Sequence, residues 1–313
     1  MFVYMRSIKK TIIPARVYMT SDIYSTPLLV NKFLRNTNNI SAKPIRNGHV
    51  YEDRCSKYIH KNFSLFGLYD GHGSTHENQI LEYTNKHLLP KIAKKCTTIS
   101  NPNEIAKQIT QSFIDIENEC RHIYGKKFKH IGCTATVVFI NSQNIITTWV
   151  GDSPCYLFTD NGFVKLVNEH SYDNPSEYRR VIHSGSQWID KRVHGTIMMS
   201  RSIGDFEDKD AGGLIALPEC KIVKRNKNQK AIFICSDGIS DVLNGEIYSN
   251  ATLTKKKKDE NIFRYLQSLR TSTPPNNFIP SIVNMTNNIL TSKKSLSKYR
   301  DDISCIYIDL TSI

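Results

Sequence analysis

No apolar run in this chain of 313 residues approaches the roughly 20 residues that a helix needs to cross a bilayer. The first 21 residues contain no Asp or Glu, yet they carry Arg6, Lys9, Lys10 and Arg16. This composition is typical of an organelle transit peptide and also of an ordinary disordered tail. We therefore expect a soluble protein without a transmembrane segment, located in the cytoplasm or nucleus, with organelle import as the less favoured alternative.

Several motifs that carry common chemistry are also missing. The eight cysteines form no C-x-x-C pair, and most lie inside apolar segments, which indicates buried, reduced thiols of an intracellular protein. No H-E-x-x-H is present, so zinc is disfavoured. Neither G-x-x-x-x-G-K-S/T nor a G-x-G-x-x-G that opens a helix occurs, which argues against a βαβ nucleotide-binding fold.

Positive charge, by contrast, is abundant. The formal net charge of +13 favours anionic partners, which include phosphoproteins, nucleic acid and acidic membrane surfaces, without choosing among them. The densest run, Lys255 to Lys258, lies between apolar segments that end near Leu243 and begin near Ile262. We predict a solvated loop there and regard a nucleic-acid patch as the weaker alternative.

Apolar periodicity divides the chain into blocks of helices and strands. Helices near 76–95 and 103–124 are expected to pack as an antiparallel pair, and a further helical pattern spans 279–290. The run Asn174-Pro175-Ser176-Glu177 supplies an N-cap, a first-turn proline and a capping acid for a short helix that ends near Gly185. Seven strands are predicted, those between 134 and 167 as one antiparallel meander. They are 63–70, 134–140, 145–150, 155–159, 163–167, 231–235 and 303–310.

This block arrangement, without regular alternation of strand and helix, indicates an α+β fold with mainly antiparallel sheets and helices outside. Residues 1–42 are rich in Ser, Thr and Asn and lack periodicity. We predict that they form an N-terminal extension that is poorly ordered or serves targeting. Residues 43–313 are predicted to form one domain.

Three of the strand-like runs end on an aspartate beside a glycine, at Asp70-Gly71, Gly151-Asp152 and Asp237-Gly238. Each pair alone is most simply a turn that closes a strand. If the three strands share one end of a sheet core, however, they bring together acids that repel one another unless cations lie between them. The recurrence therefore favours a divalent metal site.

Further acids near apolar runs extend this hypothesis, namely Glu52-Asp53, Asp241 and Asp301-Asp302. Because the candidate ligands are all oxygen atoms, hard cations such as Mg²⁺ or Mn²⁺ are preferred. The absence of a side chain at Gly71 lets its carbonyl approach a metal closely. His72 would then stand at the edge of the site.

Nine short motifs follow one another between about Lys43 and Leu310. They are Tyr51-Glu52-Asp53, Tyr69-Asp70-Gly71-His72-Gly73, Gly132-Cys133-Thr134-Ala135, Gly151-Asp152-Ser153, Asn168-Glu169-His170, Arg192-Val193-His194-Gly195, Ser200-Arg201-Ser202-Ile203-Gly204-Asp205, Ser236-Asp237-Gly238-Ile239-Ser240-Asp241-Val242 and Arg300-Asp301-Asp302-Ile303-Ser304. Each motif alone is weak, but this order and spacing are very hard to obtain by chance. The chain thus resembles the metal-dependent type-2C serine/threonine protein phosphatases.

The resemblance implies a sandwich of two mainly antiparallel β-sheets flanked by pairs of antiparallel helices, with a binuclear Mg²⁺ or Mn²⁺ centre at one end. The implied assignments are Asp70 as the bridge between both ions, Gly71 as a carbonyl ligand, Asp237 and Asp301 as ligands of one ion, Glu52 as the residue that holds the second ion mainly through its waters, and Asp152 and Asp241, together with Asp237, as a weaker third metal site.

The reaction that the resemblance implies is hydrolysis of phosphoserine and phosphothreonine on proteins through a metal-bridged hydroxide. Two cations roughly 3.5–4 Å apart lower the pKa of the bridging water enough for in-line attack on phosphorus, and no phosphoenzyme is needed. The leaving oxygen requires a proton, and His72 matches the position proposed for the general acid. The alternative role of His72 is to order water.

The sequence departs from the family's pattern at three positions. The arginine that usually stands four residues before the first glutamate is Gly48, so either a longer loop lets Arg46 grip the phosphate or substrate affinity is reduced. Arg192 is a second candidate for the phosphate side, or a structural arginine. Ser240 replaces a usual tryptophan and should loosen packing. Asp302 replaces a usual asparagine, and it either alters metal affinity or faces water.

Three classes of function stay open, and an active phosphatase is favoured. Its partners would be phosphorylated proteins, and we expect a monomer that does not bind nucleic acid. A catalytically silent relative would bind phosphopeptides without turnover. A basic nucleic-acid-associated protein would instead lose affinity as the salt concentration rises, with or without Mn²⁺.

Overall fold

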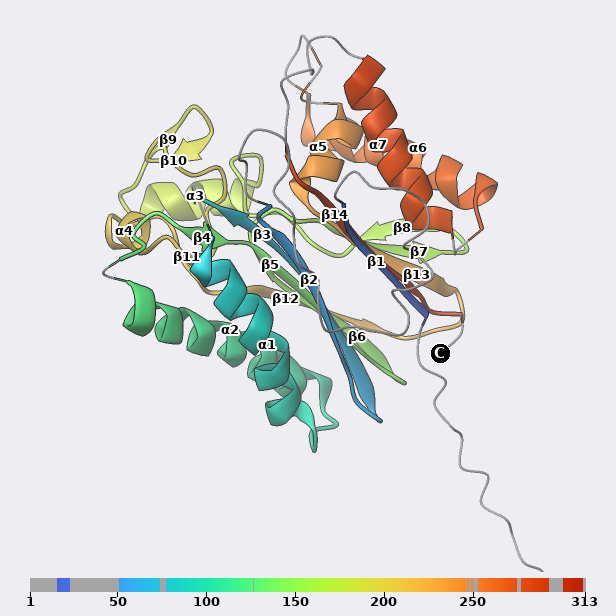
Figure 1. Cartoon of the computed structure of the whole chain (residues 1–313), viewed down its shortest axis with the longest axis horizontal. Helices are drawn as coiled ribbons and strands as arrows, with labels where there is room; N and C mark the ends of the chain where they lie inside the picture. The colour runs from blue at the N-terminus through green and yellow to red at the C-terminus, as the bar shows by residue number, and fades with distance from the viewer. Residues whose placement is uncertain are drawn as a thin grey trace, which may run out of the picture.

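The computed structural model describes residues 51–73, 77–125, 127–245, 247, 249, 253–274, 277–292 and 301–311, together with the backbone of 16–22. In these residues two β-sheets lie face to face, and helices cover the outer face of each sheet (Figure 1). The predicted α+β sandwich flanked by helix pairs is therefore confirmed.

The larger sheet has seven strands, and every pairing in it is antiparallel. The strand order is β11-β4-β3-β5-β6-β12, with β2 paired to the remaining edge of β3. The bounds are β2 Asp53–Ile59, β3 Phe63–His72, β4 Gly132–Cys133, β5 Ala135–Asn141, β6 Asn144–Val150, β11 Ile203–Gly204 and β12 Glu219–Lys224.

The smaller sheet has five strands in the order β1-β14-β13-β7-β8, again antiparallel throughout. Its central strands β13 and β14 are buried on both faces, which explains why they read as continuous apolar runs rather than as alternating ones. The bounds are β1 Arg16–Asp22, β7 Cys155–Thr159, β8 Gly162–Lys165, β13 Gln229–Cys235 and β14 Ile303–Asp309.

The prediction of a single meander between residues 134 and 167 is wrong. The hairpin β5–β6 lies in the larger sheet, and the hairpin β7–β8 lies in the smaller one. The chain crosses between the sheets over Gly151–Pro154, where Pro154 has no backbone N–H to continue a ladder. This crossing leaves Asp152 at the end of the sandwich, between the two sheets.

The core has three layers of apolar contact. Between the sheets, residues such as Phe66, Trp149 and Ile306 pack together. Helices α1 Gln79–Cys96 and α2 Pro102–Tyr124 pack on the outer face of the larger sheet. Helices α5 Asp237–Asn244, α6 Lys255–Ser272 and α7 Phe278–Ser292 cover the smaller sheet (Figure 1).

The predicted antiparallel pairing of the first two helices agrees with their ion pairs. Lys91 of α1 lies 2.7 Å from Glu119 of α2, and Lys95 lies 2.6 Å from Asp115. Residue numbers rise on one helix as they fall on the other, as an antiparallel pair requires. Both helices begin at asparagine caps, Asn78 and Asn101, whose side chains accept first-turn N–H groups.

The prediction of a solvated loop at Lys255–Lys258 is wrong, because these residues form the first turn of α6. Four lysines at a helix N-terminus are disfavoured by the helix dipole. Here Thr254 caps the helix, Lys258 pairs with Asp173 at 2.5 Å, and Lys255 contacts Asn168. Acceptors from distant parts of the chain therefore compensate for a local charge pattern that favours a loop.

Part of the predicted N-terminal extension belongs to the fold. Strand β1 pairs with β14, so seven residues of the predicted extension 1–42 join the smaller sheet. The predicted boundary at residue 42 lies outside the described residues.

Among the described helices, none is long and apolar enough to cross a membrane.

A smaller group of elements lies beside one end of the sandwich. It contains α3 Pro175–His183, the two-residue strands β9 Trp188–Ile189 and β10 Arg192–Val193, and α4 Phe206–Asp210 (Figure 1). Helix α3 begins after the predicted cap Asn174. The predicted capping role of Glu177 is wrong, because its carboxylate binds Arg180 and Arg201 instead.

Candidate functional site

Strand ends from both sheets meet at one end of the sandwich, and each carries an acid. In the larger sheet, Asp53 at the start of β2 lies directly opposite Asp70 near the end of β3. In the smaller sheet, Asp237 follows the end of β13, and Asp301 precedes the start of β14, its antiparallel neighbour. Antiparallel pairing thus brings the end of one strand to the beginning of the next.

Hydrogen bonds to Thr134 fix the backbone of Asp70. The N–H of Asp70 donates to the Thr134 hydroxyl at 3.2 Å, and its carbonyl accepts the Thr134 N–H at 2.8 Å. The same hydroxyl lies 2.9 Å from the hydroxyl of Ser153, the residue after Asp152. The motifs around Asp70, Thr134 and Asp152 are therefore linked through a pair of buried hydroxyl groups.

Close backbone packing brings Asp237 toward Asp301. A Cβ atom at Gly238 would lie 2.0 Å from the carbonyl oxygen of Asp302 and 3.4 Å from the Cβ of Asp301. Only a glycine lets the first turn of α5 approach this segment so closely. Ser236 adds hydrogen bonds to the same segment, since its N–H donates to the Ser304 carbonyl at 2.9 Å and its hydroxyl accepts the Ser304 N–H at 3.1 Å.

The carboxylates influence one another strongly. Burial raises the pKa of Asp70 well above its usual value, and the charges of Asp53, Asp237, Asp301 and Asp152 raise it further. Burial also raises the pKa of Asp237, with added repulsion from Asp301, Asp241, Asp152 and Asp53. The sequence-predicted acids Asp70, Asp237, Asp301, Asp152 and Asp241 thus lie within electrostatic range at one end of the molecule.

Asp53 also lies among these acids, although it is only a candidate from the sequence and carries no predicted metal role. It is 1% exposed, and burial, followed by repulsion from Asp302, raises its pKa to about 8. The sequence did contain a signal, because a hairpin that pairs Ile59 with Ser64 necessarily sets Asp53 opposite Asp70. Neither strand β2 nor the tight turn that joins it to β3 is among the elements predicted from the sequence.

Asp302 replaces the asparagine that is usual in the family, and one of the two alternatives was that it faces water. This alternative is wrong, because Asp302 is buried. Its Oδ2 accepts the backbone N–H of Glu52 at 2.6 Å. The Glu52 carbonyl in turn accepts the N–H of Gly71 at 2.9 Å. These bonds hold Glu52, a predicted metal residue, beside the backbone of Gly71.

Asp152 is supported by the motif that ends in His170. The Nδ1 atom of His170 accepts the N–H of Gly151 at 3.1 Å, and the His170 N–H donates to the Gly151 carbonyl at 3.0 Å. Burial raises the pKa of Asp152 to about 6, and the negative charge of Glu169 adds to this shift. The loop that carries Asp152 is thus clamped at the residue before it.

His72, the predicted general acid, ends β3 two residues after Asp70 and binds the buried carboxylate of Asp205. Its Nε2 atom lies 2.8 Å from Asp205 Oδ2 and 2.9 Å from Oδ1. Burial lowers the pKa of His72, but Asp205, with smaller contributions from Asp152 and Glu52, outweighs burial and raises it above the usual value. His72 is therefore disposed to carry a proton.

The donor set fits hard divalent cations. Asp53 Oδ2 and Asp237 Oδ1 are buried and accept no hydrogen bond within the described residues, which is costly for a carboxylate without a positive partner. Carboxylate and carbonyl oxygens are the ligands that Mg²⁺ and Mn²⁺ prefer. The assignment of each acid to a particular ion stays a prediction.

The two arginines predicted for the phosphate side are not brought to these acids by any described contact. Arg46 lies outside the described residues. Arg192 donates to the carbonyl of Thr196 at 3.0 Å, within the loop after its own strand. The roles of both arginines stay predictions.

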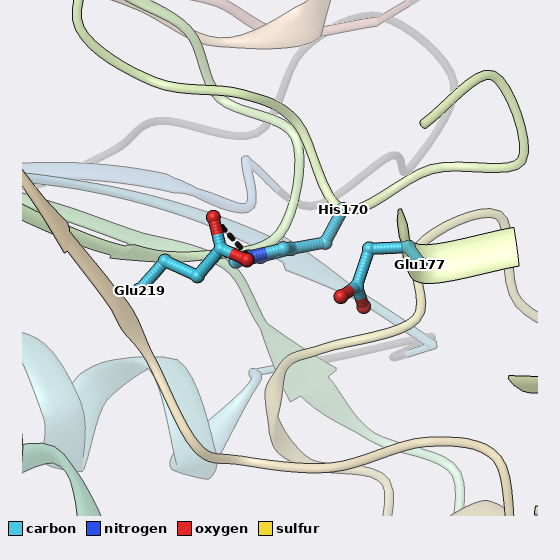
Figure 2. Close-up of side chains that lie close together, drawn as sticks. All are labelled: His170, Glu177 and Glu219. Atoms are coloured by element: carbon cyan, nitrogen blue, oxygen red, sulfur yellow. Dashed lines mark ion pairs between the residues drawn. The ribbon is translucent and has the colours of Figure 1, made fainter. Parts of the chain in front are cut away.

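In the part of the chain that the structure describes, three potential ligand atoms lie within 4.8 Å of one another only at His170, Glu177 and Glu219 (Figure 2). The acids at the sandwich end are more widely spaced. Burial opposes ionisation of Glu177, but hydrogen bonds from Arg201, Arg180 and Ser200 outweigh it and lower its pKa to about 2. Two guanidinium groups already neutralise this carboxylate, so the cluster is a buried salt-bridge network rather than a cation site.

Comparison with known proteins agrees with the geometry. The chain matches the family model described as Protein phosphatase 2C over residues 35–262. It is 32% identical over 198 residues to probable protein phosphatase 2C 6 of Oryza sativa subsp. japonica, covering 58% of this chain and 42% of that protein. It is 28% identical over 210 residues to probable protein phosphatase 2C 2 of Paramecium tetraurelia, covering 60% and 68%. The chain spans about half the length of the Oryza and Arabidopsis relatives that it matches.

Solved structures share the fold at low sequence identity. A C. elegans sex determining protein has a TM-score of 0.66 at 20% identity, covering 84% of this chain and 62% of that chain. A serine-threonine phosphatase 2C from Toxoplasma gondii has a TM-score of 0.60 at 16% identity, covering 84% and 91%. Since the family model covers well over half of the sequence, this chain belongs to the protein phosphatase 2C family.

Proposed function

We propose that this chain is a metal-dependent protein phosphatase that hydrolyses phosphoserine and phosphothreonine esters on proteins. The observation that carries the proposal is the convergence of Asp70, Asp237 and Asp301, which come from three separate strand ends, and whose charges raise the pKa of Asp70 and Asp237. A protein keeps such a cluster when cations neutralise it. Family membership supports the same reaction class.

The proposed cofactor is a pair of Mg²⁺ or Mn²⁺ ions, with a third at a weaker site. When bound, such a pair supplies the charge that lowers the pKa of a water and so provides the nucleophile for in-line attack on phosphorus. In the proposal Asp70, Asp237 and Asp301, together with Glu52 and the Gly71 carbonyl, would hold the pair. Asp152 and Asp241 would complete the third site.

His72 is proposed to protonate the leaving oxygen of the serine or threonine. An alkoxide is a poor leaving group, so a positioned acid contributes roughly 10² to 10⁴-fold to such a step. The neighbouring carboxylate of Asp205 supports the protonated form, because it raises the pKa of His72.

The test is phosphate release from a phosphothreonine peptide. We expect release with Mn²⁺, none in excess chelator, and a loss of at least about 100-fold in Asp237→Asn, because a ligand of the cation pair is weakened. Asp309→Asn is the matched control, since Asp309 is a buried acid at the opposite end of β14. Its partner Thr311 N–H can donate equally to an asparagine oxygen.

Four outcomes would contradict the proposal. Activity that persists in excess chelator, or that survives Asp237→Asn, rejects the metal-dependent mechanism. Binding of the phosphopeptide without any turnover in the wild-type protein identifies a silent relative instead. Equal losses in Asp237→Asn and Asp309→Asn would show that the effect is structural.

A further inference from the structure

Asp205 occupies an unusual position for a residue that precedes a helix. It is the N-cap of α4, yet its side chain makes no capping hydrogen bond. Its backbone is left-handed, with φ of 49°, a conformation that costs a non-glycine residue on the order of 1 kcal/mol. Aspartate at an N-cap normally accepts a first-turn N–H, so another interaction must direct this carboxylate.

That interaction is the paired contact with His72, in which both carboxylate oxygens lie within 2.9 Å of Nε2. The Ser202 hydroxyl donates to Oδ2 at 2.6 Å. Asp205 is 1% exposed, so the carboxylate has little freedom to turn away. A buried acid is thus fixed from two sides and aimed at one ring nitrogen.

The backbone opposite Asp205 leaves room for this arrangement. A Cβ atom at Gly132 would lie 2.2 Å from Asp205 Oδ2 and 2.6 Å from the Ile203 carbonyl. Any side chain at Gly132 would therefore displace the carboxylate. Gly132 also pairs with His72 across β3 and β4, and with Gly204 across β4 and β11. Because Gly132 pairs with both His72 and Gly204, the short strands β4 and β11 bring Asp205, which follows Gly204, beside His72.

The consequence for His72 is that its two nitrogen atoms have different roles. Nε2 is held by Asp205, whereas Nδ1 is buried and has no hydrogen-bond partner among the described residues. A carboxylate on one ring nitrogen fixes both the orientation of the imidazole and the proton on that atom. The ring of His72 is therefore held in one orientation at the end of β3, two residues after Asp70.

We propose that Asp205 is a positioning residue that holds the imidazole of His72 in the orientation from which it protonates the leaving oxygen of the phosphoester. The inference rests on the proposed phosphatase function and adds a residue to it. In this step the bond between phosphorus and the leaving oxygen breaks, and that oxygen keeps the electron pair and takes a proton from the His72 imidazolium. The attacking water forms the new bond to phosphorus and loses one proton to solvent, from which His72 is later reprotonated.

The experiment compares two substrates whose leaving groups differ in their need for a proton. A phosphothreonine peptide leaves as a strongly basic alkoxide, whereas p-nitrophenyl phosphate leaves as a weakly basic phenolate. We expect Asp205→Asn to lower kcat for the peptide roughly 10 to 100-fold, as a misplaced general acid would. We expect kcat for p-nitrophenyl phosphate to change less than about threefold, and KM for the peptide to stay within about twofold.

Two comparisons make the assignment specific. His72→Gln should show the same selective loss, and combining it with Asp205→Asn should add little, because both changes act through one proton donor. Asp208→Asn is the matched control. Asp208 is a buried acid of the same short helix that binds a different histidine, with its Oδ2 atom 2.8 Å from His130 Nδ1. This control should not discriminate between the substrates.

Equal losses on both substrates, or no loss on either, would overturn the role of Asp205. If Asp205→Asn does not fold, as judged by thermal unfolding, Ser202→Ala decides the matter, because it removes the hydroxyl that fixes the carboxylate. A selective loss of about threefold or more on the peptide then supports the proposal, and an unchanged ratio between the substrates rejects it. Asp237→Asn should abolish turnover of both substrates, so failure of the phosphatase assignment is recognised separately.

Discussion

Replacing Asp53 with asparagine should stabilise the metal-free protein at neutral pH. Asp53 is 1% exposed and lies opposite Asp70 in the β2–β3 hairpin. Burial and repulsion from Asp302 raise its pKa from 3.8 to about 8. Without cations, ionising this group inside the folded protein therefore costs free energy that an asparagine would not incur.

The sign follows from proton binding. Between pH 3.8 and about 8, the folded state keeps a proton on Asp53 that the unfolded state has lost. The free energy of unfolding then falls as pH rises, by about 1.4 kcal/mol per pH unit for one group. From pH 5.5 to 7.5 this amounts to a loss of about 3 kcal/mol, and coupling to neighbouring acids spreads it over several sites.

The assay is urea denaturation in excess chelator at pH 5.5, 6.5 and 7.5, which gives the free energy of unfolding directly. We expect wild-type stability to fall across this range and Asp53→Asn to show a flatter dependence. At pH 7.5 the metal-free variant should be the more stable protein, by about 1 to 3 kcal/mol. Adding Mn²⁺ should stabilise the wild type more than the variant, since binding to the folded state alone raises its stability.

A matched control is Asp190→Asn, because Asp190 is an exposed acid whose left-handed backbone asparagine tolerates equally well. It should leave the pH dependence unchanged. The reasoning is refuted if Asp53→Asn destabilises the metal-free protein at pH 7.5, or if its stability falls with pH as steeply as that of the wild type.

Three further predictions concern packing. Arg201→Met should lower the free energy of unfolding by about 3 to 5 kcal/mol in urea denaturation, because it removes a main partner of the buried Glu177 carboxylate; a change below about 1 kcal/mol would contradict this. Gly238→Ala should weaken Mn²⁺ binding measured by calorimetry at least about tenfold, because its Cβ would lie 2.0 Å from the Asp302 carbonyl oxygen, and unchanged affinity would show that this contact does not position the ligands. One thiol should react faster than the others with a thiol reagent in the native protein, and all eight should react after unfolding, since Cys220 is exposed and the other seven cysteines are buried; because burial raises the pKa of the Cys220 thiol, its rate should stay below that of an unfolded thiol, Cys220→Ser should abolish the faster phase, and a second fast thiol would contradict the packing.

Long apolar runs made most of the fold predictable from sequence. Strands β13 and β14, whose side chains are almost all buried, and the amphipathic helix α2 carry strong periodic signals and were predicted within a few residues. Strand β12 was missed because it is an edge strand whose side chains are mostly exposed. Helix α5 has only eight residues, which is too short for a 3.6-residue pattern to stand out.

The candidate site was predictable where an acid stands beside a strand end. Asp70 and Asp237 belong to this class, because an apolar run followed by Asp-Gly is visible without knowing the fold. Asp53 required the register of a hairpin, and the burial of Asp302 required the contact between α5 and the start of β14. These contacts depend on tertiary pairing, so no local pattern reports them.

Asp205 shows the same limit at longer range. It lies 133 residues from His72, and the pairing between them passes through β4 and β11, which contain two residues each. Strands of this length have no periodicity, so neither their existence nor their register can be inferred from apolar spacing. Two locally unfavourable residue choices do accompany this arrangement. Position 132 is a glycine where a Cβ atom would clash with the Asp205 carboxylate, and Asp205 itself has a left-handed backbone after Gly204. The contact that both choices permit joins Asp205 to the proposed proton donor, and at Gly132 the close approach of the Ile203 carbonyl adds a second reason for glycine.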